Sequence, residues 1–217
     1  MAIRPHVMLM HAGGLRSLVA TAATLHRAEA VRLTLLHVHD GRDTAAIRLE
    51  HVRQQADHFG LTALHELDLG SLYAGAAAVD PDGRPHATLG HARLLLAALA
   101  HAADHRAAEL VWPIAVNQDT AATARAHEQV LLTQQLLECD PPAADAGRLP
   151  GVTTPLLDLS DRQVVELGAG LGVPWDTARS CLTRSQRACG ACVACRRRSA
   201  AFRAAGVVDH AAQAVAA

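Results

Sequence analysis

Apolar runs alternate with amphipathic stretches along most of this 217-residue chain. The runs rich in Val, Leu and Ile predict buried strands, at residues 6–10, 31–38, 61–69, 109–114 and a short segment from 152. The stretches between them carry apolar residues three and four positions apart, which predicts helices at residues 15–27, 45–59, 91–108, 121–137, a segment after Ser160, and 196–205. Ser160 and Gln163 have the spacing of a capping box at a helix start.

Regular alternation of strand and helix is typical of an α/β fold with a doubly wound parallel sheet and helices on both faces. We expect a Rossmann-like nucleotide-binding domain over residues 1–150 and a small helical, metal-binding segment over 151–217. Residues 70–90 and 141–149 are rich in Gly, Pro and Asp and are predicted to be connections. Ligands of such folds bind beyond the carboxyl ends of the strands.

The amino-acid composition excludes some classes of function. Half of the residues are hydrophobic, the formal net charge is −1, and the sequence pI is close to 6.9. This balance argues against a nucleic-acid coat or a polybasic membrane anchor. The apolar runs are far shorter than the roughly 20 residues that span a bilayer, and the N-terminal residues lack the pattern of a signal peptide, so we expect a cytoplasmic protein. The fourteen histidines are expected to be scattered surface or core residues.

Four of the five cysteines fall close together, at Cys181, Cys189, Cys192 and Cys195. Cysteine pairs with two residues between them can turn both sulfurs toward one ion, and four thiolates complete a tetrahedral zinc shell. We therefore predict structural zinc, with an iron–sulfur cluster or a redox dithiol as alternatives. Cys139 stands alone and is expected to have no special role.

The stretch HAGGLRS, residues 11–17, follows the first predicted strand directly. A glycine pair between a strand and a helix can hold phosphate on the backbone N–H groups of the helix N-terminus. A glycine pair can also simply permit a positive φ, so this turn alone leaves both interpretations open.

Taken together, the two ends of the chain resemble the 7-cyano-7-deazaguanine synthase (QueC) family. The C-terminal stretch SCLTRSQRACGACVACRRRSAAFRAAG matches the family pattern of a cysteine followed by C-G-x-C-x-x-C, an arginine and AF..AG. TPLLDLSDRQVVELGAGLGVPWDTARSC is similar to the segment that precedes it, and VMLMHAGGLRSLVATA is similar to the family's S-G-G-x-D-S nucleotide loop.

This resemblance implies an ATP-pyrophosphatase fold of the adenine nucleotide α-hydrolase type, and a homodimer. It implies that ATP and Mg²⁺ serve to adenylate a 7-carboxy-7-deazaguanine-like substrate, which ammonia then attacks before dehydration to the nitrile. The partner is thus a small deazapurine or a nucleotide. The nucleotide-binding residues carried over from the family pattern are Gly13, Gly14, Leu15, Arg16, Ser17 and Arg42.

The family loop is altered here. Ala12 stands in place of the serine and Arg16 in place of the aspartate. The first change removes a hydroxyl donor, and the second reverses a charge beside a phosphate and magnesium site. Arginine can itself pair with phosphate. We therefore weigh three functions, an ATP-dependent enzyme of this type, a catalytically degenerate nucleotide- or partner-binding module, and a structural zinc protein without nucleotide.

Overall fold

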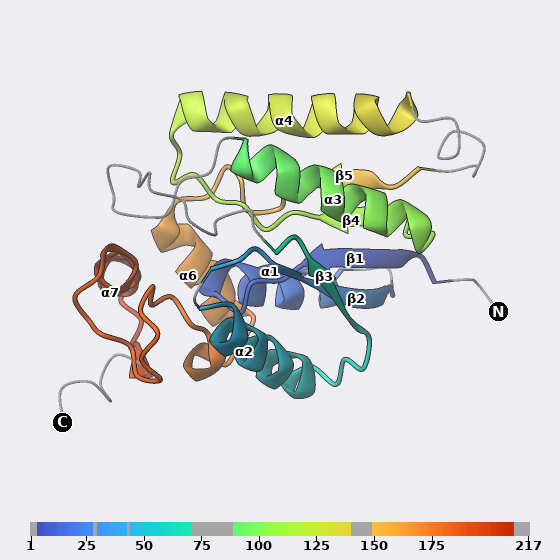
Figure 1. Ribbon diagram of the computed structural model, residues 1–217. Coiled ribbons are helices and arrows are strands. Elements are labelled where there is room, and N and C mark those ends of the chain that lie inside the picture. Colours follow the sequence, from blue (N-terminus) through green and yellow to red (C-terminus); the bar gives the residue numbers. More distant parts are fainter. Residues whose placement is uncertain (1–3, 28–29, 43, 71–88, 140–148, 211–217) are drawn as a thin grey trace.

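Five parallel strands form one sheet in the computed structural model (Figure 1). The structure describes residues 4–27, 30–42, 44–70, 89–139 and 149–210. The strands of this part are β1 (His6–Met10), β2 (Arg32–His39), β3 (Leu64–Asp68), β4 (Glu109–Val111) and β5 (Gly151–Thr153). Their order is β3-β2-β1-β4-β5, so the sheet grows in opposite directions from β1. The carboxyl ends of β1 and β4 therefore meet at the point where the strand order reverses, which is where such sheets bind ligands.

The helices lie close to where the sequence places them. They are α1 (Leu15–Leu25), α2 (Ala45–His58), α3 (Gly90–Asp104), α4 (Thr120–Glu138), α6 (Asp161–Gly170) and α7 (Val193–Ala205), with a 3₁₀ turn η1 (Trp175–Thr177). Helix α3 ends four residues earlier than predicted, because Arg106 takes a positive φ of 54° that stops the helix. Helix α7 begins three residues earlier than predicted, directly after Cys192.

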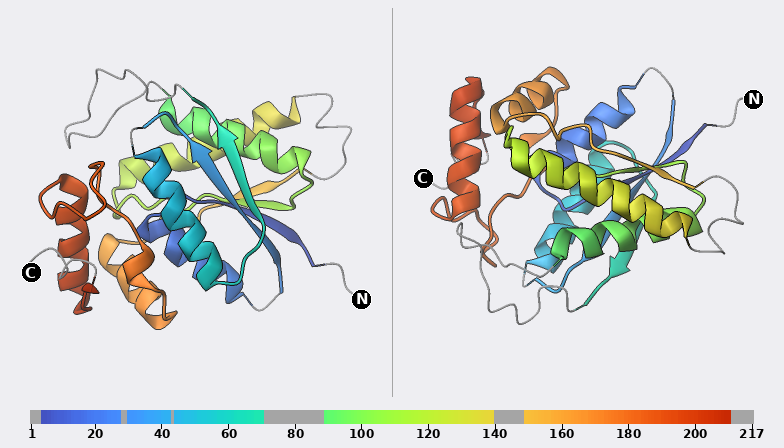
Figure 2. Two further views of the ribbon diagram at one scale, coloured as in Figure 1. Left: turned by 60° about the horizontal axis from the view of Figure 1, so that its bottom comes forward. Right: turned by 90° about the horizontal axis from the view of Figure 1, so that it is seen from above.

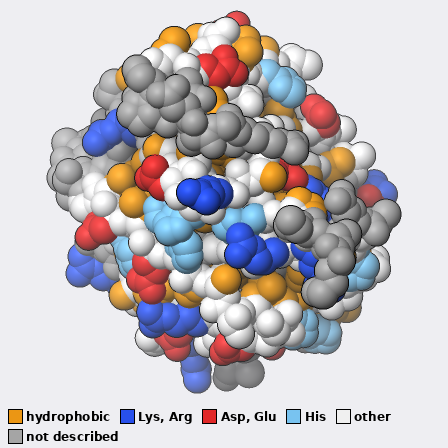
Figure 3. All heavy atoms as spheres, turned by 90° about the vertical axis from the view of Figure 1, so that its right-hand side faces the viewer, with side chains coloured by type: hydrophobic (Ala, Val, Ile, Leu, Met, Phe, Trp, Pro, Cys, Tyr) orange, Lys and Arg blue, Asp and Glu red, His pale blue; other side chains and the backbone are white. Residues whose placement is uncertain are grey.

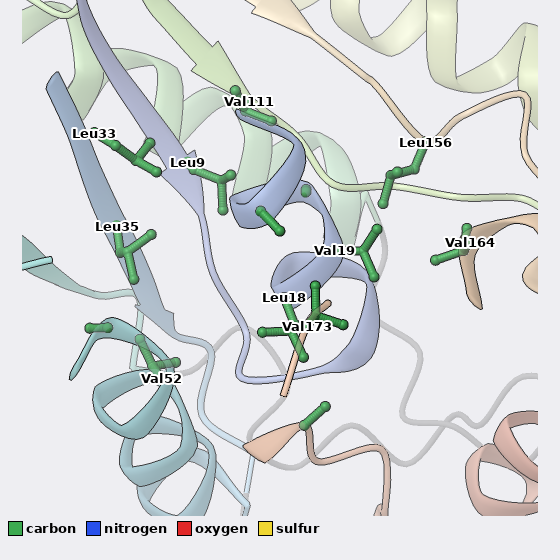
Figure 4. Close-up of a cluster of buried hydrophobic side chains, with 14 of the residues drawn as sticks. Leu9, Leu18, Val19, Leu33, Leu35, Val52, Val111, Leu156, Val164 and Val173 are labelled. Carbon is green, nitrogen blue, oxygen red and sulfur yellow. The ribbon is translucent and has the colours of Figure 1, made fainter. Parts of the chain in front are cut away.

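Alternate residues of the strands face two separate helical layers, which confirms the doubly wound α/β architecture. Val7 and Leu9 of β1 pack with α1, α2 and α6. The close-up of this cluster shows Leu9 together with Leu18, Val52 and Val164 of these helices (Figure 4). Met8 and Met10 face the opposite layer, formed by α3 and α4. In Figure 1 these layers lie below and above the sheet. Both faces are thus buried, which suits a sheet of parallel strands.

The chain beyond residue 150 shares this core. Strand β5 pairs with β4 at the sheet edge, and Leu156 and Val164 pack in the same cluster as Leu9. Ser160 and Gln163 form the predicted capping box at the start of α6. Helix α7 lies beside α6 at the end of the molecule away from the N-terminus (Figure 2). The division into two domains at residue 150 stays a prediction, since the hydrophobic core continues across it.

Candidate functional site

The turn after β1 requires glycine at one position. Gly13 has a φ of +68°, which L side chains rarely adopt. A Cβ atom there would also lie 2.6 Å from the backbone oxygen of Arg48 on α2. Gly13 is thus fixed both by its backbone conformation and by the close approach of α2.

Three hydrogen bonds hold the backbone of the turn at Gly13, two of them from outside the turn. The carbonyl oxygen of Gly13 accepts a hydrogen bond from Gln55 Nε2 at 3.2 Å and another from the backbone N–H of Arg179 at 2.9 Å. The same Gln55 nitrogen donates to the carbonyl oxygen of Thr177 at 2.8 Å. The third contact is a hydrogen bond of 3.2 Å from the Gly13 N–H to Nδ1 of His11. The turn conformation therefore depends on α2 and on residues 177–179.

His11 is fully buried below the turn. Burial, and to a smaller extent the neighbouring His37, lowers the pKa of His11 to about 3, so the ring is neutral at physiological pH. A neutral ring that accepts from Gly13 at Nδ1 carries its proton on Nε2. The backbone oxygen of His11 lies 2.8 Å from Nδ1 of His37, which joins the ends of β1 and β2.

A cavity of about 640 Å³ opens at the start of α1. Gly14 is the N-cap of α1, and Leu15, Arg16 and Ser17 form its first turn. All four residues line the cavity. The first backbone N–H groups of an α-helix have no acceptor within the helix, and the helix dipole places partial positive charge there. This end of the cavity is therefore suited to an anion.

The wall of the cavity is strongly cationic. Six arginines line it, Arg16, Arg42, Arg48, Arg179, Arg197 and Arg198. Among the described lining residues, Asp161 is the single carboxylate. The near-neutral net charge of the chain thus hides a local excess of positive charge. Arginine binds phosphate oxygens through a fork of N–H donors, so this lining fits a polyphosphate.

Asp161 sits between two of these arginines. Nη2 of Arg16 lies 2.9 Å from one carboxylate oxygen, and Nε of Arg197 donates to the other. Burial acts to raise the pKa of Asp161, but the hydrogen bonds from Arg197 and Arg16 outweigh it and lower the pKa. Asp161 is therefore ionised, and its carboxylate links Arg16 of α1 to Arg197 of α7.

Arg198 is fixed by an acid outside the cavity lining. It pairs with Asp209 through Nε at 2.7 Å and Nη2 at 2.8 Å, and both side chains are buried. Nη2 also donates to the carbonyl oxygen of Trp175. Arg198 therefore fastens α7 to the turn that follows α6.

Arg179 connects the glycine turn to the segment that holds the four cysteines, residues 181–195, which we call the cysteine segment. Its guanidinium group donates to the backbone oxygens of Thr183, Ser185 and Gln186, while its backbone N–H holds Gly13. Nε of this buried side chain has no hydrogen-bond partner among the residues that the structure describes. A buried donor without a partner costs free energy.

The lining does not fit a magnesium ion. Mg²⁺ in nucleotide sites is held by carboxylate oxygens and water. The described lining offers only Asp161, and both of its oxygens are already paired with arginine. Among the described lining residues, the expected Mg²⁺ therefore lacks a free carboxylate ligand.

The four predicted cysteines converge. Their sulfur atoms all lie within 4.8 Å of one another, and this group could hold a metal ion. Tetrahedral zinc with Zn–S bonds of about 2.3 Å needs sulfurs about 3.8 Å apart. The backbone N–H of Cys189 donates to the sulfur of Cys181, and that of Cys192 donates to the sulfur of Cys189, both at 3.3 Å. Gly190 takes a φ of +69° between them.

The pKa values of the Cys181 and Cys195 thiols are shifted in opposite directions. Burial acts to raise the pKa of Cys181, but hydrogen bonds from Thr183 and the Cys189 backbone outweigh it and bring the pKa to about 6. Burial and the neighbouring Cys192 raise the pKa of Cys195. Cys195 lies in the first turn of α7, where the early start of this helix brings its sulfur back to the other three.

The cysteine segment also forms part of the cavity wall. Leu182 follows Cys181 and Ala194 precedes Cys195, and both line the cavity. A metal ion in the four-sulfur group would thus fix the side of the cavity opposite the α1 turn.

Of the predicted nucleotide-binding residues, Gly14, Leu15, Arg16, Ser17 and Arg42 line the cavity, and Gly13 forms the turn beneath it. Sequence reasoning missed five further residues, Arg48, Asp161, Arg179, Arg197 and Arg198. Arg197 and Arg198 belong to a run of arginines that directly follows Cys195. Its position one helical turn beyond the last ligand was the available signal for a second role.

A family profile described as "Queuosine biosynthesis protein QueC" matches residues 6–206. This match covers nearly the whole chain. The chain belongs to the QueC family.

Curated relatives of this QueC-family chain are named 7-cyano-7-deazaguanine synthase. The relative from Chlorobaculum parvum is 29% identical over 222 residues, which cover 93% of both chains. The relative from Thermosynechococcus vestitus is 50% identical over 58 residues, which cover 27% of this chain and 25% of the relative. A role like that of 7-cyano-7-deazaguanine synthase is thus supported.

Among solved structures, the chain is similar to the U34-tRNA thiolase NcsA from Methanococcus maripaludis with its [4Fe-4S] cluster. The TM-score is 0.53 at 12% identity, and the match covers 93% of this chain and 65% of the thiolase chain. This likeness agrees with the expected ATP-pyrophosphatase type of fold. No helix in the described residues is long and apolar enough to cross a membrane.

Proposed function

We propose that this QueC-family protein binds the phosphates of ATP in the arginine-lined cavity, with guanidinium groups in place of carboxylate-bound Mg²⁺. The observation that carries the proposal is the lining itself, in which six arginines surround the N-terminus of α1 and Asp161 is the single carboxylate of the described part. Helix N–H groups bind one phosphate, and the arginines neutralise the rest of the chain of phosphates.

The reaction that we propose is the one named for the curated relatives, acting on a 7-carboxy-7-deazaguanine-like substrate. A carboxylate oxygen of the substrate attacks the α-phosphorus of ATP, the bond to the β-phosphate breaks, and pyrophosphate leaves. Ammonia then displaces AMP, and loss of water gives the nitrile. The arginines would contribute by stabilising the negative charge that develops on pyrophosphate, which is electrostatic catalysis by fixed donors.

A second candidate is a catalytically degenerate nucleotide- or partner-binding module. The observation that favours it is the pairing of Asp161 with both Arg16 and Arg197, which leaves the described lining without a carboxylate free for Mg²⁺. In this case ATP or AMP would bind without turnover.

Turnover separates the two candidates. The purified protein is incubated with ATP, ammonium and 7-carboxy-7-deazaguanine, with and without Mg²⁺, and AMP, pyrophosphate and the nitrile are measured by mass spectrometry. Formation of AMP and nitrile supports the enzyme. Binding of ATP by calorimetry without either product supports the degenerate module. Absence of ATP binding in both conditions contradicts the proposal as a whole.

For the four cysteines we propose structural Zn²⁺. The convergence of the sulfurs within 4.8 Å suits one tetrahedral ion, and four thiolates leave no open position for catalysis. Metal analysis of the purified protein tests this, with one zinc per chain as the expected result. A content of several irons per chain would support the iron–sulfur alternative.

We also propose that the protein forms a homodimer, as the family resemblance implies. Helix α4 exposes Leu131, Leu132 and Leu136, each more than half accessible to solvent. A second copy covering these side chains would remove them from water. Sedimentation of the protein and of a Leu132→Asp, Leu136→Asp variant tests this, with a dimer and a monomer as the expected results.

A further inference from the structure

Three histidines gather at the edge of the sheet opposite the arginine-lined cavity. His65 lies on β3, His101 in the last turn of α3, and His105 is the C-cap of α3. Because α3 packs antiparallel to the strands, its C-terminus reaches the edge where the strands begin. Figure 3 shows this face, where histidine side chains lie together in the middle of the surface.

The ring nitrogens of these histidines converge. Each ring offers one nitrogen, and the three atoms all lie within 4.8 Å of one another. Nδ1 of His65 is 3.1 Å from Nε2 of His101. The ring centroids of His65 and His105 are 4.5 Å apart, and those of His101 and His105 are 4.4 Å apart. Zn–N bonds of about 2.0–2.1 Å place the nitrogens of a tetrahedral site about 3.4 Å apart, so small rotations of the rings suffice.

Local structure explains the convergence. His101 and His105 are four residues apart, so they lie on the same side of the end of α3. His65 faces α3 from the sheet, because its neighbour Glu66 points to the other side and pairs with His39 and Arg53. The three ligands thus come from β3 and from the C-terminal end of α3.

The protonation state and the surroundings suit a metal ligand set. Burial, followed by the charge of His105, lowers the pKa of His65. Burial, followed by His105 and His65, lowers the pKa of His101, and Asp104 acts in the opposite direction. The lowered pKa values favour the neutral rings of His65 and His101, which is the form that binds metal. His105 is exposed, so an ion at this place would also reach water.

We propose that His65, His101 and His105 form a second metal site, which binds a divalent transition-metal ion such as Zn²⁺ through three imidazole nitrogens and leaves a fourth position to solvent. Imidazole ligands suit zinc, copper, nickel and cobalt. Three histidines with an open position differ in kind from the closed four-sulfur group. The site joins β3 to the end of α3, and its existence is independent of what the arginine-lined cavity binds.

Cobalt distinguishes the two sites. The protein is first loaded with Zn²⁺ at the cysteines, and loosely held metal is removed. It is then dialysed against Co²⁺, which does not displace zinc from four thiolates, and metal per chain is measured by mass spectrometry. We expect one additional cobalt per wild-type chain, with a ligand-field spectrum that lacks thiolate-to-cobalt charge transfer.

Substitutions assign the site. A His101→Gln, His105→Gln variant should lose the additional cobalt, while His127→Gln, an exposed histidine of α4, should retain it. Added Co²⁺ should raise the Tm of the wild type and leave the Tm of the double variant unchanged. The melting transition of the double variant also shows whether that variant is folded. The proposal is overturned if the wild type takes up no additional cobalt, because the rings are then only a hydrogen-bonded group. It is equally overturned if the double variant binds cobalt as the wild type does.

Discussion

The backbone N–H of Arg179 donates a hydrogen bond to the carbonyl oxygen of Gly13 at 2.9 Å, across 166 positions of sequence. The guanidinium group of the same arginine holds the segment that leads into the cysteine cluster. The glycine turn and the cysteine segment are therefore joined through one residue. A substitution that disturbs the glycine turn should therefore also disturb the cysteine segment, and the reverse.

The glycine turn gives the first prediction. Gly13→Ala should lower the free energy of unfolding by about 2–4 kcal/mol, from a positive φ and a clash with the Arg48 backbone oxygen at 2.6 Å. Gly172→Ala is the matched control, because Gly172 has a φ of +65° and nothing within 4 Å of the added Cβ. It should cost only about 1–2 kcal/mol. Urea unfolding measures both, and equal losses would show that the close approach of α2 is unimportant.

The cluster of four cysteines gives the second prediction. Cys192→Ser should lose bound metal and lower stability by about 3 kcal/mol or more, which is roughly 6–12 °C in Tm for a chain of this size. It should also weaken ATP binding, because Leu182 and Ala194 of the same segment line the cavity. Cys139→Ser, at an exposed cysteine, should keep metal and Tm. A Cys192→Ser variant with full metal content and wild-type Tm would contradict the assignment.

The pairing of Asp161 with Arg16 and Arg197 gives the third prediction. Asp161→Asn removes the negative charge that competes with phosphate for both arginines, so the affinity for ATP without Mg²⁺ should rise about tenfold. Asp158→Asn removes the same charge three residues away, at an exposed position outside the cavity lining, and should change the affinity little. Calorimetry at fixed ionic strength compares them. Equal effects would mean that only long-range charge matters.

The altered loop gives the fourth prediction. An Ala12→Ser, Arg16→Asp variant returns the family's hydroxyl and carboxylate to the cavity. It should bind ATP more weakly than the wild type without Mg²⁺ and more strongly with it, because the introduced carboxylate can hold the ion. Arg16→Ala removes the cation alone and should weaken binding in both conditions. If Mg²⁺ leaves the double variant unchanged, the rest of the metal site is missing as well.

His11 gives the fifth prediction. Its pKa is about 3 in the folded protein, against 6.5 for a histidine exposed to water, so between these values the unfolded chain holds more protons. The free energy of unfolding should therefore fall as the pH drops from 6.5 toward 3, by at most about 1.4 kcal/mol per unit for one group. His11→Leu removes this contribution. Its unfolding free energy, measured across that range, should have the shallower slope, and an unchanged slope would exclude His11 as the cause.

The strands, the helices and the four cysteines could be predicted because each follows from local spacing. The short apolar run from Val7 to Met10, followed by a glycine pair, predicts a buried strand, and four cysteines within fifteen positions can approach one another through local turns. The arginine lining could not be predicted in this way. Arg16 and Arg197 lie 181 positions apart, and the packing of both α1 and α7 against α6 brings them to the same carboxylate. A net charge near zero concealed how unevenly the charges are placed.

The three histidines show the same limit. His101 and His105 have helical spacing that can be seen in the sequence, but the position of β3 relative to the end of α3 decides whether His65 joins them. The histidines were expected to be scattered, since pairing along the chain does not reveal neighbours across a sheet.

The backbone of the glycine turn accepts hydrogen bonds from Gln55 and Arg179 and packs closely against α2, whereas the altered side chain of Arg16 pairs with Asp161 on α6. Substitution at positions 12 and 16 thus exchanges the chemical character of the loop without reshaping it. The turn keeps its backbone conformation when these side chains differ. Members of the family can therefore carry a metal-dependent loop or a cationic loop on the same architecture.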